Sequence, residues 1–180
     1  MKNIIHIVGA SGSGTSTLGR AVEDKFAYKW LDTDDYFWIP TNPPYREVRP
    51  VEERVKLIKT DTEKYPKCVL SGSLSGWDDD YFIPLFDLVV FVYTPAITRL
   101  ERLSKRESQK HGNRILPGGD MHEKHTAFIE WAGTYDNSED TNQRSFAKHK
   151  EWLKLMLCPV LRLDGTKAID ELLGQIRAVL

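Results

Sequence analysis

The sequence predicts an α/β fold, a three-layer single domain in which helices cover both faces of a parallel β-sheet. Short apolar runs rich in β-branched residues alternate with longer segments of helical pattern, which is the element order typical of parallel sheets. The run Leu88–Tyr93 is apolar throughout, as expected of a strand buried on both faces. The length of 180 residues suits one compact domain, so we expect residues 1–180 to fold as a unit.

Five segments have the pattern of buried strands, and six segments between and after them have a helical pattern. Pro50 and Pro95 support two helix starts, because proline fits a first turn and disfavours helix in the residue before it. The charged, glycine-rich segment 110–120 separates two helices and is expected to be either a functional lid or plain surface. The expected strands are Asn3–Val8, Trp30–Asp32, Lys67–Ser71, Leu88–Tyr93 and Pro159–Leu163. The expected helices are Ser16–Phe26, Val51–Lys64, Pro95–Glu107, His122–Tyr135, Ser145–Leu157 and Ala168–Leu180.

Composition argues against several classes of partner. Charged residues make up 28% of the chain and the net charge is −1, so no global charge drives it onto nucleic acid or an anionic membrane. The apolar run near the N-terminus is too short for a signal peptide or a membrane span, which favours a cytoplasmic protein. Cys68 and Cys158 lie in or beside apolar runs and are expected to be reduced thiols. A monomer and a homodimer are both compatible with the sequence.

A glycine-rich loop, Gly9–Thr17, follows the first expected strand and precedes the first expected helix. Glycines let the backbone curl so that successive N–H groups point at phosphate oxygens, and the positive end of the next helix lies at the same place. This order of strand, loop and helix is the context that a phosphate-binding loop requires. The expected phosphate-binding residues are Gly9, Ser11, Gly12, Ser13, Gly14, Thr15, Ser16 and Thr17, and Ser16 has the position of the Mg²⁺-coordinating hydroxyl.

One position departs from the Walker A pattern G-x-x-x-x-G-K-[ST], because Thr15 stands where a lysine follows the last glycine. That lysine reaches the terminal phosphates of a bound triphosphate and offsets their charge. Its loss is expected to weaken both binding and transition-state stabilisation. A plain strand-to-helix connection is the alternative interpretation, but the matching positions in the right context favour a phosphate site.

With this loop, the chain resembles the P-loop kinases of small molecules, the adenylate, cytidylate, shikimate and uridine kinase group, near the topology-modulation proteins. The resemblance covers the glycine loop, an acidic motif after the second strand, an arginine helix before a lid, and a final strand and turn. It implies the P-loop NTPase fold, the strand order 2-3-1-4-5, a site at the carboxyl ends of the strands and a lid at about residues 107–121. It also implies that Thr15 is a tolerated variant, that the turn containing Thr166 packs near the adenine ring, and that Cys68 and Cys158 form no disulfide.

Acidic residues follow the second expected strand. In kinases of this group that phosphorylate a hydroxyl, an aspartate here accepts or orients the acceptor proton, whereas a monophosphate acceptor needs no base. Asp34 and Asp35 therefore favour a hydroxyl acceptor, and a solvated turn or helix cap is the alternative. After the third strand, where the group usually has a metal-orienting carboxylate, the chain has Ser71 and Ser73. Either a serine orients a metal-bound water there, an aspartate such as Asp34 takes over, or the segment is simply a tight turn.

An arginine-rich helix precedes the expected lid. Arg99, Arg102 and Arg106 are spaced so that they share one helix face, and phosphoryl transfer needs cations around the moving group. Arg102 and Arg106 match the arginine pair of the monophosphate kinases, and Arg114 in the lid is expected to swing in on closure. These residues are the candidates to replace the absent lysine. A salt-bridged, solvated face is the alternative, because Glu101 and Glu107 lie nearby.

Other side chains invite weaker interpretations. The cluster of His111, His122 and His125 carries no cysteine and does not favour zinc, and His6 is expected to be a core residue. Trp38, Trp77 and Trp131 are expected either in the core or in the walls of an acceptor pocket.

The sequence as a whole predicts a Mg²⁺- and ATP-dependent phosphotransferase. Its expected acceptor is a nucleotide, a nucleoside or another small molecule, with nucleic acid and membrane not expected as partners. The alternative is a nucleotide-binding regulatory module without transferase activity, which the two departures from the P-loop kinase pattern favour.

Overall fold

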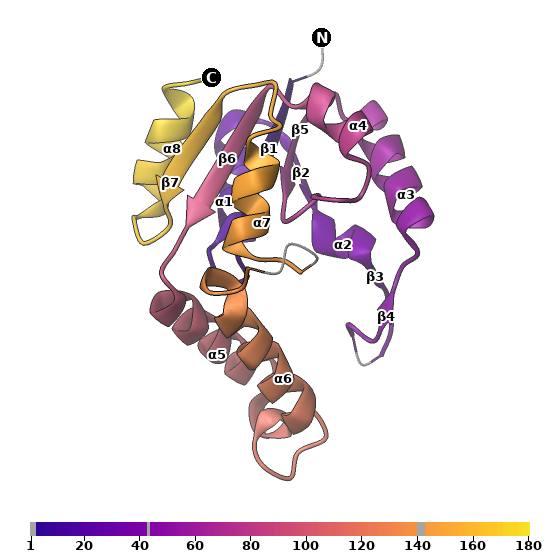
Figure 1. Cartoon of the computed structure of the whole chain (residues 1–180), viewed down its shortest axis with the longest axis vertical. Coiled ribbons are helices and arrows are strands. Elements are labelled where there is room, and N and C mark those ends of the chain that lie inside the picture. The colour runs from indigo at the N-terminus through magenta and orange to yellow at the C-terminus, as the bar shows by residue number, and fades with distance from the viewer. Residues whose placement is uncertain (1–2, 43, 140–142) are drawn as a thin grey trace.

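A computed structural model describes residues 3–42, 44–139 and 143–180 of the chain. Five parallel strands form the central sheet, in the order β2-β5-β1-β6-β7 (Figure 1). Counted along the chain, this is the expected order 2-3-1-4-5, so the fold prediction is confirmed. The strands are β1 (Asn3–Gly9), β2 (Lys29–Asp32), β5 (Lys67–Ser71), β6 (Leu88–Tyr93) and β7 (Val160–Asp164).

Helices pack on both faces of the sheet because its central strands are apolar on both sides. In β1, Ile5 and Ile7 face the layer of α1 (Thr15–Phe26) and α8 (Ile169–Arg177). Ile4 and Val8 point the other way, into the core beneath α3, α4 and α7. This alternation follows from the two-residue period of a strand. The helices of the second layer are α3 (Val51–Lys64), α4 (Asp79–Phe82, continued by the 3₁₀ turn η1, Ile83–Leu85) and α7 (Phe146–Leu153).

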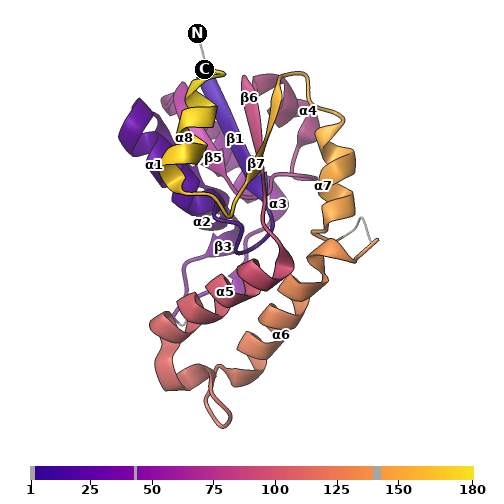
Figure 2. The same cartoon turned by 90° about the vertical axis from the view of Figure 1, so that its left-hand side faces the viewer.

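Two helices project beyond the carboxyl ends of the strands and run side by side (Figures 1 and 2). They are α5 (Ala96–His111) and α6 (His122–Gly133), joined through the 3₁₀ turn η2 (Gly112–Ile115), and a further turn η3 (Thr134–Asp136) ends α6. The expected end of α5 at Glu107 was wrong, because the helix continues to His111 and shortens the expected loop. Helix α7 also ends earlier than expected, at Leu153, and the following residues form turns with exposed Leu155 and Leu157.

The three short elements between β2 and α3 were not predicted. Helix α2 (Thr33–Phe37) follows β2 directly, and β3 (Trp38–Ile39) pairs antiparallel with β4 (Glu47–Val48) in a hairpin. Each is too short to show a hydrophobic period in the sequence. Together they bring the chain across the carboxyl end of the sheet, opposite α5 and α6 (Figure 1).

Several smaller expectations can also be compared with the fold. Cys68 and Cys158 are free thiols, as expected. His6 is fully buried in β1, where its ring stacks on Phe86 and bonds to the Gly72 carbonyl. Among the described residues, no helix has the length and apolar character needed to cross a membrane.

Candidate functional site

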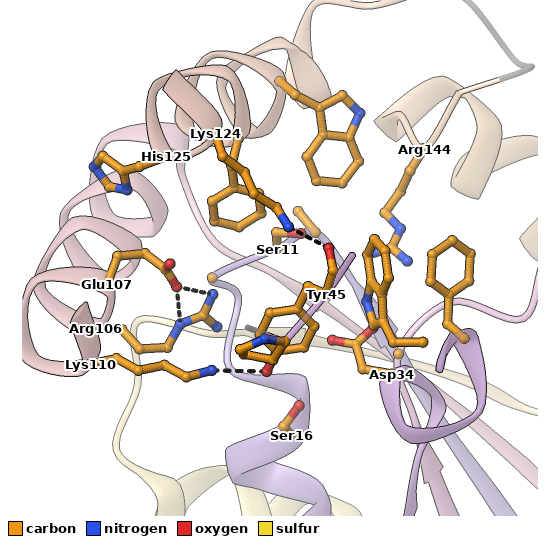
Figure 3. Close-up of a pocket in the computed structure, with 18 of the residues that line it drawn as sticks. Ser11, Ser16, Asp34, Tyr45, Arg106, Glu107, Lys110, Lys124, His125 and Arg144 are labelled. Atoms are coloured by element: carbon orange, nitrogen blue, oxygen red, sulfur yellow. Dashed lines mark hydrogen bonds and ion pairs between the residues drawn. The ribbon is translucent and has the colours of Figure 1, made fainter. Parts of the chain in front are cut away.

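A cavity of about 830 Å³ lies at the carboxyl end of the sheet. Its floor is the glycine loop, one wall is the segment from α2 through the β3–β4 hairpin, and the other wall is the α5–α6 pair (Figure 3). A smaller pocket adjoins it between the glycine loop and α5. The carboxyl end of a parallel sheet is where ligands bind in folds of this type.

The glycine loop has the curled form that phosphate binding requires. Gly14 caps α1 with a φ of 98°, and Gly12 has a φ of 81°, so both need the left-handed region that glycine tolerates. The Ser13 N–H donates to the Ala10 carbonyl at 3.0 Å, which closes the turn. Of the expected phosphate-binding residues, Gly9, Ser11, Gly12, Thr15 and Ser16 line the large cavity, Gly14 and Thr17 line only the smaller pocket, and the buried Ser13 lines neither.

Asp32, the last residue of β2, is a site residue that sequence reasoning missed. It lines the cavity, and its carboxylate accepts hydrogen bonds from the Ser16 hydroxyl and, at 3.1 Å, from the Asp34 N–H. Burial raises the pKa of Asp32, with the hydrogen bond from Ser16 opposing this shift. The hydroxyl of Ser16 and the carboxylate of Asp32 thus place two oxygen donors at the cavity floor, and oxygen is the donor type that Mg²⁺ prefers.

The two serines at the carboxyl end of β5 bond to other side chains of the protein. Ser71 accepts the indole N–H of Trp30 at 2.8 Å, and Ser73 shares a hydrogen bond with His149 at 3.2 Å. Both serines are buried and neither lines the cavity, so a role of either in orienting a metal-bound water stays a prediction.

The two aspartates of α2 differ in their position. Asp34 lines the cavity and its side chain is drawn inside it in Figure 3, whereas Asp35 does not line the cavity. Burial, and then the neighbouring charge of Asp34, raise the pKa of Asp35. Of the predicted pair, only Asp34 lines the cavity, and its role toward an acceptor stays a prediction.

The arginines of α5 have three different environments. Arg102 and Arg106 line the smaller pocket beside the glycine loop, and an Nη atom of Arg102 lies 4.0 Å from where a Cβ on Gly14 would stand. Arg106 also lines the large cavity and pairs with Glu107 at 3.0 Å. Arg99, by contrast, is fully buried. Arg114 pairs with Asp120 at 2.7 Å and does not line the cavity, so a contact between Arg114 and a phosphate stays a prediction.

Aromatic rings line both walls above the floor. Trp38 and Phe37 come from the α2–β3 segment, and Phe128 and Trp131 come from α6. Trp77 does not line the cavity; its ring stacks on Phe37, and the Arg54 guanidinium lies over both rings, 4.6 and 4.7 Å from their centroids. Of the three tryptophans considered from sequence, Trp38 and Trp131 are thus wall residues and Trp77 is a packing residue.

Tyr45, at the end of the hairpin loop, bridges the two walls. Its hydroxyl accepts from Lys110 of α5 at 3.0 Å, and its carbonyl accepts from Lys124 of α6 (Figure 3). Lys110, Lys124 and the adjacent Arg144 add cationic side chains to the cavity, and none of them was singled out from the sequence. These residues are far apart in the sequence, so no local pattern indicates that they lie together, although Lys110 continues the charged face of α5.

The remaining predicted residues lie at the edges of the site. Thr166 donates from its N–H and its hydroxyl to Asp164 and does not line the cavity, so its contact with a nucleotide stays a prediction. The preceding Gly165 packs on the glycine loop, since a Cβ there would stand 2.8 Å from the Ser13 carbonyl. The histidines form no metal site: across the described ranges, no group of three His, Cys, Asp or Glu side chains could hold an ion.

Comparison with known proteins places the chain in a family. The sequence pattern of a family described as an AAA domain matches residues 5–129. The uncharacterized protein YqaC of Bacillus subtilis (strain 168) is 42% identical over 176 residues, covering 98% of this chain and 96% of that protein. A cytidylate kinase of Archaeoglobus fulgidus is 30% identical over 116 residues, which cover 58% of this chain and 62% of that kinase.

A solved structure supports the same conclusion for the fold. The unliganded sugar kinase of Janibacter sp. HTCC2649 superimposes with a TM-score of 0.54 and 17% identity, over 99% of this chain and 94% of that one. At this identity the likeness concerns the fold alone. The family match over residues 5–129 shows that the chain belongs to the AAA domain family, and the glycine loop, the strand order and the sequence relatives show that it is one of the P-loop proteins that resemble nucleoside-monophosphate kinases.

Proposed function

We propose that the protein is a Mg²⁺- and ATP-dependent phosphotransferase acting on a nucleotide, a nucleoside or another small acceptor. The observation that carries this proposal is the hydrogen-bonded pair of Ser16 and Asp32 at the floor of a cavity whose other end is aromatic and cationic. One half of such a cavity suits a metal triphosphate and the other half suits an acceptor. The protein's main task in phosphoryl transfer is to position these two and to stabilise charge.

Ser16 and Asp32 are the residues that would hold Mg²⁺. When bound, the ion would offset the charge on the phosphate oxygens. The raised pKa of Asp32 fits this role, because a carboxylate that burial makes costly to ionise gains most from a neighbouring cation. The glycine loop would bind the phosphates through its N–H groups and the N-terminus of α1.

Arg102 and Arg106 are proposed to replace the missing P-loop lysine. They lie on the α5 side of the loop, and both line the pocket that Gly12, Gly14 and Thr15 line. A guanidinium binds phosphate through two parallel N–H groups, so it can fix geometry as well as charge. Arg106 reaches both pockets, which places it between the phosphate side and the acceptor side.

The acceptor end of the cavity favours a molecule with a planar ring. Trp38 on one wall and the stacked pair of Phe128 and Trp131 on the other offer ring faces and edges to such a molecule. Asp34 would orient an acceptor hydroxyl, whereas Lys110, Lys124 and Arg144 would suit a phosphate already present on the acceptor. The α5–α6 pair, including residues 107–121, is proposed to close over both substrates as a lid.

The test is ADP formation from MgATP with a panel of nucleoside monophosphates, nucleosides and small ring hydroxy compounds, beside a control without acceptor. We expect one class to accelerate ADP release. Acceleration by a monophosphate supports the cationic wall, and acceleration by a hydroxyl compound supports Asp34. Tight MgATP binding without acceleration by any class would contradict the transferase and favour the regulatory module, for which Thr15 in place of lysine is the supporting observation.

Replacing Arg106 by Ala is expected to lower kcat at least tenfold, because the variant loses the guanidinium shared by both pockets. Steady-state kinetics with MgATP measure this, and Arg177→Ala, at an exposed position of α8 away from the cavity, is the matched control. Unchanged kcat in the Arg106 variant would remove this residue from the mechanism.

Arg114→Ala tests the lid prediction separately. A similar loss of kcat in this variant would mean that Arg114 leaves Asp120 and enters the site during turnover.

A further inference from the structure

Arg99 is a charged side chain that the proposed phosphate contacts do not use. It lies in the first turn of α5 and is fully buried, the largest side chain of the described residues to be so. Its Nε donates to the Thr94 carbonyl at 3.0 Å. One Nη atom donates to the carbonyls of Ser11 at 3.3 Å and Ala132 at 3.1 Å. The other Nη atom pairs with Asp136. A buried arginine with this many backbone contacts holds its neighbours in fixed positions.

Thr94 makes a similar contact with the glycine loop, at a carbonyl two residues after that of Ser11. Its buried hydroxyl donates to the Ser13 carbonyl at 3.2 Å. The carbonyls of Ser11 and Ser13 are therefore both bonded to groups from the junction of β6 and α5. The intervening backbone is held close as well, since a Cβ on Gly12 would stand 2.7 Å from the Arg99 carbonyl oxygen.

Because a trans peptide is planar, a contact that fixes one carbonyl also fixes the direction of the following N–H group. In such a peptide, the C=O of one residue and the N–H of the next point in opposite directions. Fixing the Ser11 carbonyl toward the buried Arg99 directs the Gly12 N–H away from the protein interior. Fixing the Ser13 carbonyl toward Thr94 does the same for the Gly14 N–H. Phosphate oxygens bind to N–H groups of this kind.

We infer that Arg99 and Thr94 are positioning residues that orient the Gly12 and Gly14 amides of the glycine loop for phosphate binding. The inference rests on the proposed triphosphate site. It gives a reason why the loop can serve without its lysine, since amides fixed in advance need no reorganisation when the ligand arrives. Because Arg99 also bonds Ala132 in the last turn of α6 and Asp136 in the turn η3 that follows it, the same guanidinium joins the loop to the base of the proposed lid.

The test combines affinity with a residue-specific signal. Thr94→Val keeps the shape of the side chain but removes the hydroxyl, and Thr94→Ser keeps the hydroxyl. We expect the dissociation constant for MgATP to rise at least fivefold in Thr94→Val and to stay within twofold of wild type in Thr94→Ser. Arg99→Lys keeps the positive charge but loses the planar guanidinium with its several N–H donors. We expect the dissociation constant for MgATP to rise at least tenfold in this variant. The KM for the acceptor is expected to change less than the KM for MgATP in each variant.

Amide NMR separates an orienting role from a merely structural one. In the wild type, MgATP should shift the amide protons of both Gly12 and Gly14 downfield. Thr94→Val should lose the Gly14 shift and keep that of Gly12, and Arg99→Lys should do the reverse. If folded Thr94→Val binds MgATP with unchanged affinity and both shifts, the inference is overturned while the proposed function stands. If wild type does not bind MgATP, the proposed function fails, and the inference fails with it.

Discussion

The Asp32→Asn variant is expected to lose at least a hundredfold in kcat and to unfold at a higher temperature than wild type. The amide has the shape of the carboxylate but no charge, so the Ser16 pair can no longer hold Mg²⁺ firmly. The stability of the protein without bound Mg²⁺ is expected to rise because the largest influence on the Asp32 pKa is burial, which makes the ionised form costly. Steady-state kinetics and thermal unfolding at neutral pH measure the two effects.

Asp35→Asn is the matched control for this change. Asp35 lies in α2, the short helix that directly follows Asp32, does not line the cavity and also has a raised pKa through burial. We expect its kcat to stay within threefold of wild type while its unfolding temperature rises slightly. Equal losses of kcat in the two variants would mean that the total negative charge of the segment from Asp32 to Asp35 determines kcat, rather than the pair formed by Asp32 and Ser16.

Acid is expected to unfold the protein steeply below pH 6.5 because of two buried histidines. Burial lowers the pKa of His6 to about 4. It lowers the pKa of His149 to about 3, helped by the charge of Arg144. In the unfolded chain both protonate near the ordinary value of 6.5, so their stabilising effect is complete above that pH and is lost as pH falls toward 4. Each contributes a slope of about 1.4 kcal/mol per pH unit in this window, and the two together about 2.7 kcal/mol.

Urea unfolding at several pH values between 7 and 4.5 measures this slope. A loss on the order of 5 kcal/mol over two pH units is comparable to the whole stability of a typical domain. His149→Gln keeps a polar partner for Tyr135, whose hydroxyl bonds to His149 at 2.8 Å, but removes one titrating group. We expect the slope to fall by about half in this variant. A free energy of unfolding that is flat down to pH 5 in wild type would contradict the burial of neutral histidines.

The parts of the structure that sequence predicted well are those with a local physical signal. A strand such as Leu88–Tyr93 is buried on both faces, and its apolar run marks its ends to the residue. The glycine loop was recognisable for the same reason, because the left-handed residues Gly12 and Gly14 sit at fixed spacing between a strand and a helix. Expected helix ends were less accurate, since α5 continues past Glu107 with no change of pattern.

The parts that sequence missed depend on partners far apart in the chain. Asp32 was counted as the end of a strand, and only the fold brings it to Ser16. The helical spacing predicted that Arg99 shares a helix face with Arg102. In the fold Arg99 is buried and bonds to the carbonyls of Ser11 and Ala132, which helical spacing cannot predict. The aromatic and cationic walls likewise come from α2, α6 and the segment before α7. One signal for the cavity floor was present in the sequence: Asp32 at the end of a predicted strand and Asp34 two residues later indicate an oxygen-rich site.

The contact of Gly165 with the glycine loop has a consequence for how the protein is made on the ribosome. The loop is complete once residue 17 has been added, but the turn that packs on Ser13 and Thr94 comes nearly 150 residues later. Strand β7, which carries this turn, pairs only with β6 among the described strands, so it joins the edge of the sheet late. Chains shortened before residue 165 should therefore lack a fully supported loop. Nucleotide binding at the proposed site would then require residues that are synthesised well after most of the sheet.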